Sequence, residues 1–290
     1  MKPAPFRYVR ASRLDDALAE LARYGDDAKV LAGGQSLIAQ MNLRLIRPAV
    51  LVDINQLADI AYIRQDNGGV AIGALTRQSA VESSEVIARR CPLMAEAIRY
   101  VAHRPIRNRG TVGGNLAHAD PTSELPAVAV ALGATFLART QKDQRTIPAA
   151  DFFVSPLTTA LAPNELLTEL RVAAWPARQG WSFMEVSPRA GDYALVGVAA
   201  TLRAEDGVCE AARLVYSGVG SRPIRAEAAE QGLVGRPSRE ATFREAAEIA
   251  AEHVDPPSDF HASAEYRRDL VRALTRRALL AALERCEKGA

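Results

Sequence analysis

Two glycine-rich stretches carry the residues whose types and spacing could do chemistry. The first is Ala32-Gly33-Gly34-Gln35-Ser36, and the second is Thr111-Val112-Gly113-Gly114-Asn115. Glycine lets the backbone approach a ligand closely, and consecutive amides in such turns form concavities that bind anions. Two loops of this kind could close on the two phosphates of a dinucleotide from opposite sides. No other part of the sequence resembles a self-contained catalytic set.

The first stretch follows an apolar segment and precedes a helical one. Its functional interpretation is that the amides of residues 33–37, with the helix N-terminus at Ser36, hold a phosphate. The alternative is a plain tight turn, because a Gly-Gly pair is common between a strand and a helix. The pattern is neither Gly-x-Gly-x-x-Gly nor a phosphate loop with Gly-Lys-Ser or Gly-Lys-Thr, so the nicotinamide-type fingerprint does not apply.

The second stretch adds polar side chains. Thr111 offers a hydroxyl, and Asn115 can both donate and accept hydrogen bonds. Both interpretations are open for the residues just downstream: Asp120 caps a helix and Glu124 occupies a first helical turn, or both belong to a cluster for sugar hydroxyls. That cluster, suited to ribose or ribityl oxygens, consists of Asp120, Thr122, Ser123 and Glu124.

Composition limits the classes of function. The chain has 290 residues, a formal net charge of +2 and only 6% aromatic residues. These values argue against nucleic acid as the partner, because such binding demands a concentrated basic face or stacking aromatics. Residues 1–6 lack the apolar core of a secretion signal, and the longest apolar run, 125–138, is too short to cross a bilayer. We therefore expect a cytoplasmic protein without a membrane span.

The cysteines and histidines show no metal-ligand spacing. No Cys-x-x-Cys occurs, so an iron–sulfur or zinc site built on that spacing is absent from the sequence. Three widely separated cysteines fit buried thiols in a reducing compartment. The residues concerned are Cys91, Cys209, Cys286, His103, His118, His253 and His261.

The N-terminal segment alternates helix and strand. Ser12 and Asp15 predict a capped helix from Leu14, which Gly25 would end. A strand over 29–32, a helix over 36–45 and a strand over 50–54 follow. Short links between these elements predict a small parallel unit.

The rest of the chain divides near Trp175-Pro176-Ala177. Before this point, the pattern predicts strands over 70–75, 134–140, 145–148 and 166–172, helices over 76–90, 92–102 and 122–132, and an irregular basic loop over 104–109. Beyond it, we expect an antiparallel sheet of three strands over 181–187, 193–203 and 211–219, then helices over 224–233, 238–251 and 264–287. The last helix carries Leu270, Leu274, Ala278 and Ala281 on one side, and its arginines 267, 268 and 272 are expected at a solvated or subunit-facing edge.

The two glycine motifs resemble those of a known family. Residues 29–37 (Lys29-Val30-Leu31-Ala32-Gly33-Gly34-Gln35-Ser36-Leu37) and 107–121 are similar to the FAD-binding medium subunit of molybdenum-containing hydroxylases. This is the family of bacterial carbon monoxide dehydrogenase and of the flavin domain of xanthine dehydrogenase. The similarity continues through Gly191-Asp192-Tyr193-Ala194 and Glu265-Tyr266-Arg267-Arg268, so it spans essentially the whole chain.

The resemblance implies an α+β fold of two domains. The first, residues 1–175, would be a two-part α/β FAD-binding domain (PCMH-type) with subdomains 1–56 and 57–175. The second, residues 176–290, would contain a three-stranded antiparallel sheet and a helical bundle.

The resemblance also implies a set of FAD-binding residues. One group would wrap the pyrophosphate, a second group would meet it from the other side, and a third would reach sugar oxygens and the ring. In that order they are Lys29, Val30, Leu31, Ala32, Gly33, Gly34, Gln35, Ser36 and Leu37; Thr111, Gly114 and Asn115; and Asp120, Glu124, Val101, Leu167 and Tyr193. The alternative for Tyr193, which would approach the isoalloxazine ring, is an ordinary half-buried strand tyrosine.

One position departs from the family pattern. Many relatives have a lysine shortly before the Gly-Asp-Tyr-Ala stretch, and Glu185 stands at the corresponding place. A lysine could stabilise negative charge on reduced flavin, whereas a glutamate would oppose that charge unless it is turned away. The substitution therefore bears on the flavin potential and not on FAD binding itself.

The implied function is electron transfer within a heterotrimer. A large subunit with a molybdenum–pterin centre would hydroxylate the substrate, and a small subunit with two [2Fe–2S] clusters would pass electrons to FAD in this chain, in a dimer of heterotrimers. FAD would then reduce an external acceptor: quinone, oxygen, NAD or a carrier protein. The substrate stays open among carbon monoxide, aldehydes and N-heteroaromatics such as purines. The alternatives are a free-standing flavin oxidase of the same fold and an interaction protein that has lost the cofactor.

Overall fold

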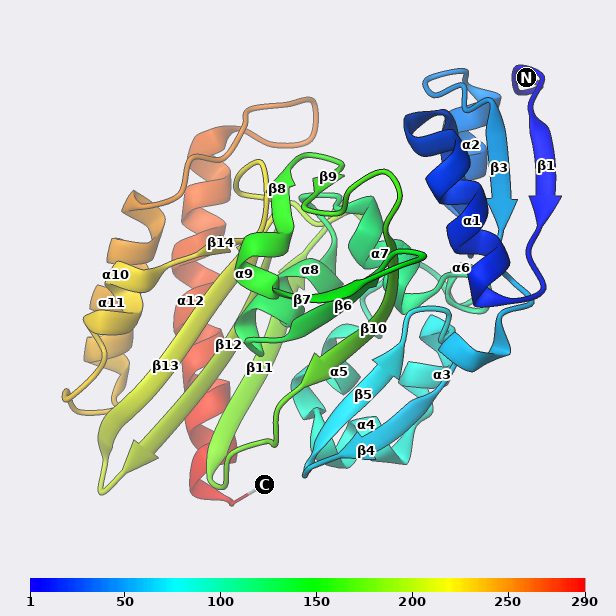
Figure 1. Cartoon of the computed structure of the whole chain (residues 1–290). Helices are drawn as coiled ribbons and strands as arrows, with labels where there is room; N and C mark the ends of the chain where they lie inside the picture. Colours follow the sequence, from blue (N-terminus) through cyan, green and yellow to red (C-terminus); the bar gives the residue numbers. More distant parts are fainter. Residues whose placement is uncertain (290) are drawn as a thin grey trace.

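The N-terminal unit is a three-stranded parallel sheet with two helices (Figure 1). The computed structural model describes residues 1–289 of the chain. β3 lies between β1 and β2 and runs parallel to both, as the strand–helix–strand pattern predicts, although β1 itself was not anticipated. The elements are β1 (Arg7–Arg10), α1 (Leu14–Tyr24), the 3-10 turn η1 (Gly25–Asp27), β2 (Ala28–Leu31), α2 (Leu37–Asn42), β3 (Val50–Asp53) and the 3-10 turn η2 (Ala58–Ile60).

The ends of α1 follow from local chemistry. Asp16, and not Asp15, is the acid that caps the helix, because its carboxylate accepts from the Arg13 amide at 3.1 Å and from the Ser12 hydroxyl at 3.1 Å. The predicted cap is therefore displaced by one residue. Gly25, with φ +49°, ends the helix as expected.

The middle unit is a five-stranded antiparallel sheet with short helices on one face. Its strand order is β4-β5-β10-β6-β7, and β8 and β9 form a separate two-stranded ribbon. Strands β4, β8 and β9 were not anticipated. The elements are β4 (Ile63–Asp66), β5 (Gly69–Gly73), α3 (Gln78–Glu82), α4 (Glu85–Arg90), α5 (Pro92–Ala97), α6 (Arg104–Arg107), α7 (Val112–His118), α8 (Glu124–Ala131), β6 (Thr135–Arg139), β7 (Gln144–Pro148), α9 (Ala149–Phe152), β8 (Phe153–Ser155), β9 (Thr158–Thr159) and β10 (Leu166–Val172).

Four predicted assignments in this unit were wrong in detail, the first being the helix predicted over 92–102, which ends at Ala97. The helix predicted over 76–90 is two helices, because the Ser84 side chain accepts from the Ile87 amide at 3.3 Å and starts a new one. The basic segment predicted to be irregular contains the short helix α6, whose first turn includes Pro105. The helix predicted from Thr122 begins at Glu124 with Ser123 as its N-cap.

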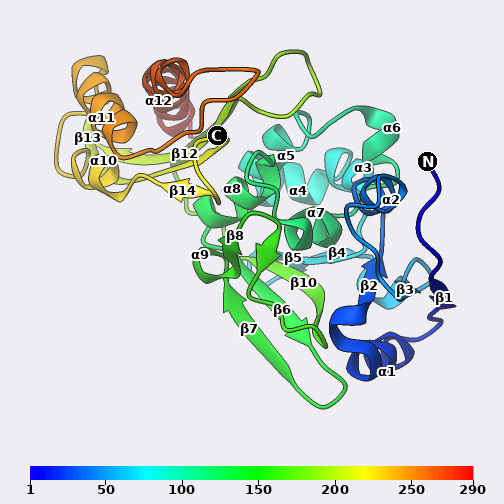
Figure 2. The ribbon, with the colours of Figure 1, turned by 90° about the horizontal axis from the view of Figure 1, so that it is seen from above.

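Helix α8 is the centre of the molecule. All eight of its residues are buried, since it packs between the middle sheet and the C-terminal sheet (Figure 2). A helix that is apolar nearly all round can only be accommodated in this way. The long apolar run over 125–138 is thus α8 and the start of β6, and no helix of the described residues is long and apolar enough to span a membrane.

The C-terminal unit is an antiparallel sheet backed by helices. The sheet has four strands, not three, because Ile224 and Arg225 form a short edge strand where a helix was expected. One face of the sheet packs against the middle unit through Phe183, Ala199 and Val215, and the other carries a second core under the helices. The elements are β11 (Gln179–Val186), β12 (Val196–Glu205), β13 (Val208–Ser217), β14 (Ile224–Arg225), α10 (Glu227–Gln231), α11 (Glu240–Glu252) and α12 (Ala264–Glu287).

Two residues of this unit lie in places that differ from the predictions. Tyr193 precedes β12, in the connection from β11, so it is not a strand residue. Arg267 does not lie at a solvated edge of α12: it is 3% exposed and bonded to backbone carbonyls. The predicted bounds of α12 itself are confirmed.

Candidate functional site

The first glycine stretch is a loop with unused donors. It leaves the end of β2 and turns at Gly34, whose φ is +73°. Within the described residues, the amides of Gly33, Gly34, Gln35 and Ser36 donate to no recorded acceptor. The Gln35 side chain donates to the Gly33 carbonyl at 3.0 Å, which steadies the turn from its own side. Four consecutive free amides form a concavity that suits an anion.

The second glycine stretch is the first turn of α7 rather than a loop. Thr111 is its N-cap and accepts from the Gly114 amide at 3.0 Å. The Val112 amide donates to the Thr76 carbonyl at 3.0 Å, and the Gly113 amide donates to the Ala74 carbonyl at 2.8 Å. These amides therefore serve the fold, and the second motif offers side chains and an exposed Gly114 surface instead.

The two motifs touch. A Cβ built on Gly33 would lie 2.6 Å from the Arg109 carbonyl oxygen and 2.8 Å from Gly110 Cα. A Cβ on Gly114 would lie 3.8 Å from Ala32 Cβ. The N-terminal unit thus meets the middle unit at this contact, and only glycine at position 33 permits it.

Three side chains that sequence reasoning missed hold this contact together. The Asn55 amide group donates to the Ala32 carbonyl at 2.8 Å and to Asp53 Oδ1 at 2.7 Å. Arg77 donates to Asn55 Oδ1 at 2.8 Å and, with its other terminal nitrogen, to the Arg109 carbonyl. The one available signal was polar residues directly after the buried strand β3, at the edge where β2 also ends.

Partial burial also changes the pKa of Arg77 in this network. Desolvation, and next the charge of Arg109, lowers the pKa of Arg77. Arg77 and Arg109 therefore concentrate positive charge beside the free amides. A cavity of about 470 Å³ adjoins Asn55 and Arg77, but it is lined by none of the glycine-motif residues.

The polar cluster after α7 is ordered by its own hydrogen bonds. Asp120 Oδ1 accepts from the Thr122 amide at 2.9 Å and from the Thr122 hydroxyl at 2.6 Å, so Asp120 makes a turn and does not cap α8. The Ser123 hydroxyl donates to Asn115 Oδ1 at 2.9 Å. This bond connects the second glycine motif directly to the start of α8.

Glu124 is a buried acid without an arginine partner. Its side chain follows Ser123 in the first turn of α8, and the residue is 6% exposed. Burial, which outweighs hydrogen bonds from its own amide and Ser123, raises the pKa of Glu124 to about 7. Near neutral pH this carboxyl can therefore both accept and donate hydrogen bonds to a ligand hydroxyl.

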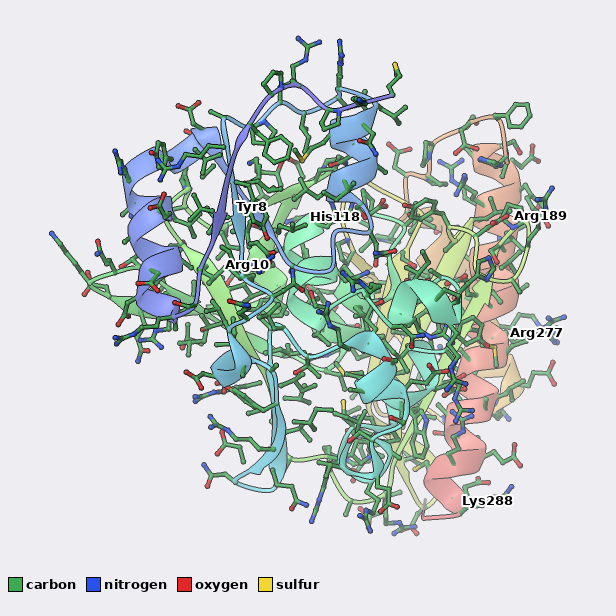
Figure 3. All side chains as sticks on the ribbon, turned by 90° about the vertical axis from the view of Figure 1, so that its right-hand side faces the viewer. Tyr8, Arg10, His118, Arg189, Arg277 and Lys288 are labelled. Carbon is green, nitrogen blue, oxygen red and sulfur yellow. The ribbon has the colours of Figure 1, made fainter. Side chains whose placement is uncertain are left out.

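Tyr193 and His118 lie on the open side of this cluster. Tyr193 is 67% exposed, and partial desolvation, then the charges of Asp120 and Glu124, raise the pKa of its phenol. His118 lies at the last turn of α7, between the N-terminal unit and the C-terminal helix in the view of Figure 3. Burial lowers the pKa of His118, so the ring is neutral around pH 7.

The remaining candidate residues flank the free amides along the chain or belong to the middle core. Lys29, Val30 and Leu31 lie on β2, and Leu37 begins α2. Val101 is 5% exposed, and its carbonyl accepts from Arg107 at 2.9 Å. Leu167 is 4% exposed and belongs to the middle core, at a bulge between β10 and β6. The structure thus brings the two glycine motifs, Asp120, Glu124 and Tyr193 to one side of the molecule.

Comparison with known proteins matches both halves of the chain. Residues 4–175 match the family described as "FAD binding domain in molybdopterin dehydrogenase". Residues 181–282 match the "CO dehydrogenase flavoprotein C-terminal domain". The two matches meet near the predicted division of the chain at residues 175–177.

Individual relatives are similar over nearly their full lengths. The 6-hydroxypseudooxynicotine dehydrogenase complex subunit alpha of Paenarthrobacter nicotinovorans is 42% identical over 98% of this chain and 97% of its own. The caffeine dehydrogenase subunit beta of Pseudomonas sp. (strain CBB1) is 40% identical over the same shares. A solved structure of carbon monoxide dehydrogenase from Hydrogenophaga pseudoflava has a TM-score of 0.96 at 37% identity, with 99% of this chain and 100% of that chain covered.

Proposed function

Because the chain belongs to the family of FAD-binding medium subunits of molybdenum-containing hydroxylases, we propose that it carries electrons through FAD within such a complex. The chain is an oxidoreductase subunit that binds FAD. The finer claims are that electrons arrive from [2Fe–2S] clusters of a small partner subunit and leave to an external acceptor. When bound, FAD supplies the two-electron chemistry, while this chain binds, orients and tunes it.

The residues present fit that cofactor. The single observation that carries the proposal is the run of four free amides, Gly33 to Ser36, held against the second glycine motif. A diphosphate would accept from these amides, and Arg77 and Arg109 add positive charge beside them. Asn115, Asp120 and Glu124 would meet sugar or ribityl hydroxyls, and Tyr193 would approach the ring.

The partners follow from the family. We propose a large molybdenum–pterin subunit and a small iron–sulfur subunit, assembled as a dimer of heterotrimers. The described residues contain no cluster of three or more metal-ligating side chains, which suits a chain that receives electrons from another. The substrate is chosen in the large subunit, so carbon monoxide, aldehydes and N-heteroaromatics stay open. All three cysteines are free and buried, which agrees with our proposal of a cytoplasmic protein.

We propose two domains, residues 1–175 and 176–290, with the first divided at residues 56–57. The first division separates the two family matches. Most of the small core under the parallel sheet lies before the second division, although Leu57, Ile60, Leu75 and Leu166 also pack into it. Limited proteolysis of the chain tests both divisions.

Competition for FAD binding tests the proposed site. The purified chain is titrated with FAD, and ADP, FMN and riboflavin are then tested as competitors. Since the amides are expected to hold the diphosphate, ADP should displace FAD and riboflavin should not. A chain that takes up no FAD would contradict the proposal. A chain that binds FAD and turns over a substrate without partner subunits would instead be a free-standing oxidase.

Asn55→Ala should weaken FAD binding without unfolding the chain. The substitution removes the bonds to the Ala32 carbonyl and to Arg77, so the first loop is no longer fixed on the second motif. We expect about tenfold weaker affinity, which corresponds to about 1.4 kcal/mol and one lost hydrogen bond. The control is Asn164→Ala in an exposed connection. Equal affinities for the two variants would remove Asn55 from the site.

Tyr193→Ala should separate binding from reactivity. The side chain is mostly exposed and lies in a connection, so it contributes little to the fold. We expect FAD affinity within about threefold of wild type, as for a surface substitution worth about 0.5 kcal/mol. The reduction midpoint and the turnover of the complex should change. If neither changes, Tyr193 does not contact the ring.

A further inference from the structure

Most buried or half-buried glutamates in the middle and C-terminal units are paired with arginine. Glu82 pairs with Arg107 at 3.0 Å, Glu165 with Arg145 at 2.6 Å, and Glu230 with Arg225 at 2.6 Å. Glu169 likewise pairs with Arg64 and Arg171. Among the described residues, no ion pair is recorded for Glu124 or Glu185, although burial affects both. An unpaired buried carboxylate is costly, so such a group neutralises by holding a proton.

Glu185 lies in one row with Gly197 and Ser217 across the C-terminal sheet. The strand register places Glu185 opposite Gly197, and Gly197 opposite Ser217. A Cβ on Gly197 would lie 2.5 Å from Ser217 Oγ and 3.8 Å from Glu185 Oε2. Because Gly197 has no side chain, Ser217 Oγ and Glu185 Oε2 both lie over its backbone.

The two oxygens that lie over Gly197 have no hydrogen-bond partners. Glu185 Oε2 and Ser217 Oγ are buried, and neither has a recorded hydrogen bond. Ser217 is 0% exposed. A deprotonated Glu185 offers only acceptors to this space, whereas a protonated one offers a donor that a hydroxyl or a water can accept.

The groups that face Glu185 come from two neighbouring elements, and none is a cation. Glu124 faces it from the start of α8, and its negative charge raises the pKa of Glu185 further. Tyr100, which follows α5, feels the charge of Glu185 in turn and stacks on Phe183 of β11 at 5.2 Å between ring centroids. Burial first and Glu124 second raise the pKa of Glu185 from its ordinary 4.5 to about 9.

Glu185 and Ser217 lie next to the candidate FAD site. Glu124 follows Ser123, which donates to Asn115 of the second glycine motif. The Gly218 amide, next to Ser217, donates to the Pro121 carbonyl at 2.9 Å, beside Asp120. The Leu195 amide donates to the Val186 carbonyl at 2.8 Å, which closes the connection that carries Tyr193 from the end of β11. Glu124, Asp120 and Tyr193 are the residues expected at the ribityl chain and the ring.

We propose that Glu185 is a neutral carboxylic acid which holds one buried proton over Gly197, near Ser217 and beside the flavin, so that a proton donor and not a cation faces the charge of reduced FAD. This inference rests on the proposed function for its second half only. The proton at Glu185 is a property of the chain without cofactor. Its effect on flavin requires FAD to bind as proposed.

Infrared spectroscopy of the FAD-free chain tests the proton. The band of a protonated carboxylic acid should be present at pH 8, because Glu185 then keeps its proton while Glu124 has mostly lost its own. The band should disappear in Glu185→Gln and persist in Glu124→Gln and in the exposed control Glu210→Gln. Ser217→Ala should shift its frequency, because the substitution removes the buried hydroxyl that lies over Gly197 with the acid. Absence of the band in wild type, or its persistence in Glu185→Gln, overturns the proposal.

Stability against pH gives a second readout that needs no cofactor. Because the folded chain holds a proton that the unfolded chain releases above about pH 4.5, wild type should lose stability as pH rises from there toward 9. Glu185→Gln cannot titrate, so its unfolding midpoint should fall less over this range. Parallel pH profiles for the two proteins would contradict a protonated Glu185.

The midpoint potential of bound FAD tests the second half of the proposal. At pH 7, Glu185→Gln should match wild type, because an amide resembles the neutral acid. Glu185→Lys should raise the midpoint, because it places a cation beside reduced flavin. Above pH 9, wild type should fall below Glu185→Gln as the acid ionises. Equal midpoints in all three proteins at every pH would show that Glu185 does not act on the flavin, whereas failure to bind FAD would contradict the proposed function instead.

Discussion

Gly33→Val should abolish FAD retention while the chain stays folded. Any Cβ at this position meets the backbone of Arg109 and Gly110, so the first loop must move away from the second motif. The four free amides, from Gly33 to Ser36, can then no longer donate together to one diphosphate. Loss of two charge-assisted hydrogen bonds of about 1.5 kcal/mol each gives about 100-fold weaker binding.

A matched glycine tells this effect apart from general damage. Gly232→Ala places a methyl group at ordinary contact distance, 3.4 Å from its nearest neighbours. Gly33→Ala already collides, so we expect it to lose affinity and Gly232→Ala to keep it. The measurement is the FAD dissociation constant from flavin fluorescence, with circular dichroism to confirm folding. Tight FAD binding by folded Gly33→Val would exclude the first loop as the diphosphate site.

The structure gives a different reason for a glycine at position 33 than the sequence of the loop suggests. From the sequence alone, a side chain at Gly33 or at Gly114 is expected to block the approach of a phosphate. In the structure, Gly33 faces the backbone of the second motif, and Gly113 packs against Ala74. Glycine at position 33 is therefore required for the contact between the N-terminal and middle units, which in turn positions the amides. Such a contact joins residues far apart in sequence, and no local pattern reports it.

Local signals predicted what local chemistry determines. The bounds of α12 and β10, the parallel N-terminal unit and the turn at Gly25 follow from periodicity and glycine placement, and the structure agrees. The family resemblance added FAD and the family itself, which the comparisons confirm, and the two-domain division, which stays a prediction. Short edge strands such as β4 and β14 could not be predicted from the sequence. Their few residues form strands only because they pair with neighbouring strands that the fold places beside them.

The electrostatics of the site depend on register, and sequence alone could not give them. Glu185 lies beside Gly197 and Ser217 only because β11, β12 and β13 align these three residues in one row. A shift by one residue would turn all three side chains to the opposite face of the sheet. Under our proposal the expected conflict between a glutamate and reduced flavin does not arise, because burial and the charge of Glu124 raise the pKa of Glu185 to about 9 and keep the acid neutral.

Arg267→Met should destabilise the chain and loosen the connection that carries Tyr193. The guanidinium is 3% exposed and donates to the Leu195 carbonyl at 2.5 Å, to the Gly218 carbonyl at 3.1 Å and to Asp259 at 2.7 Å. Methionine fills similar space but leaves two buried carbonyls without donors. Each such orphan costs about 1–3 kcal/mol, so we expect a loss of about 3 kcal/mol in unfolding free energy.

Arg268→Met is the matched control, because it changes the same residue type one position along α12. Its ion pair with Asp255 spans 3.6 Å, and the Asp255 carboxylate is fully exposed, so we expect a change within about 0.5 kcal/mol. Urea unfolding gives both values, and hydrogen exchange locates the loosening. Because Arg267 binds the residues that follow Tyr193 and Ser217, exchange should rise at 187–195 and at 218–222 in Arg267→Met alone. Equal stability of the two variants would mean that water replaces the guanidinium, and that α12 does not hold the flavin side of the sheet in place.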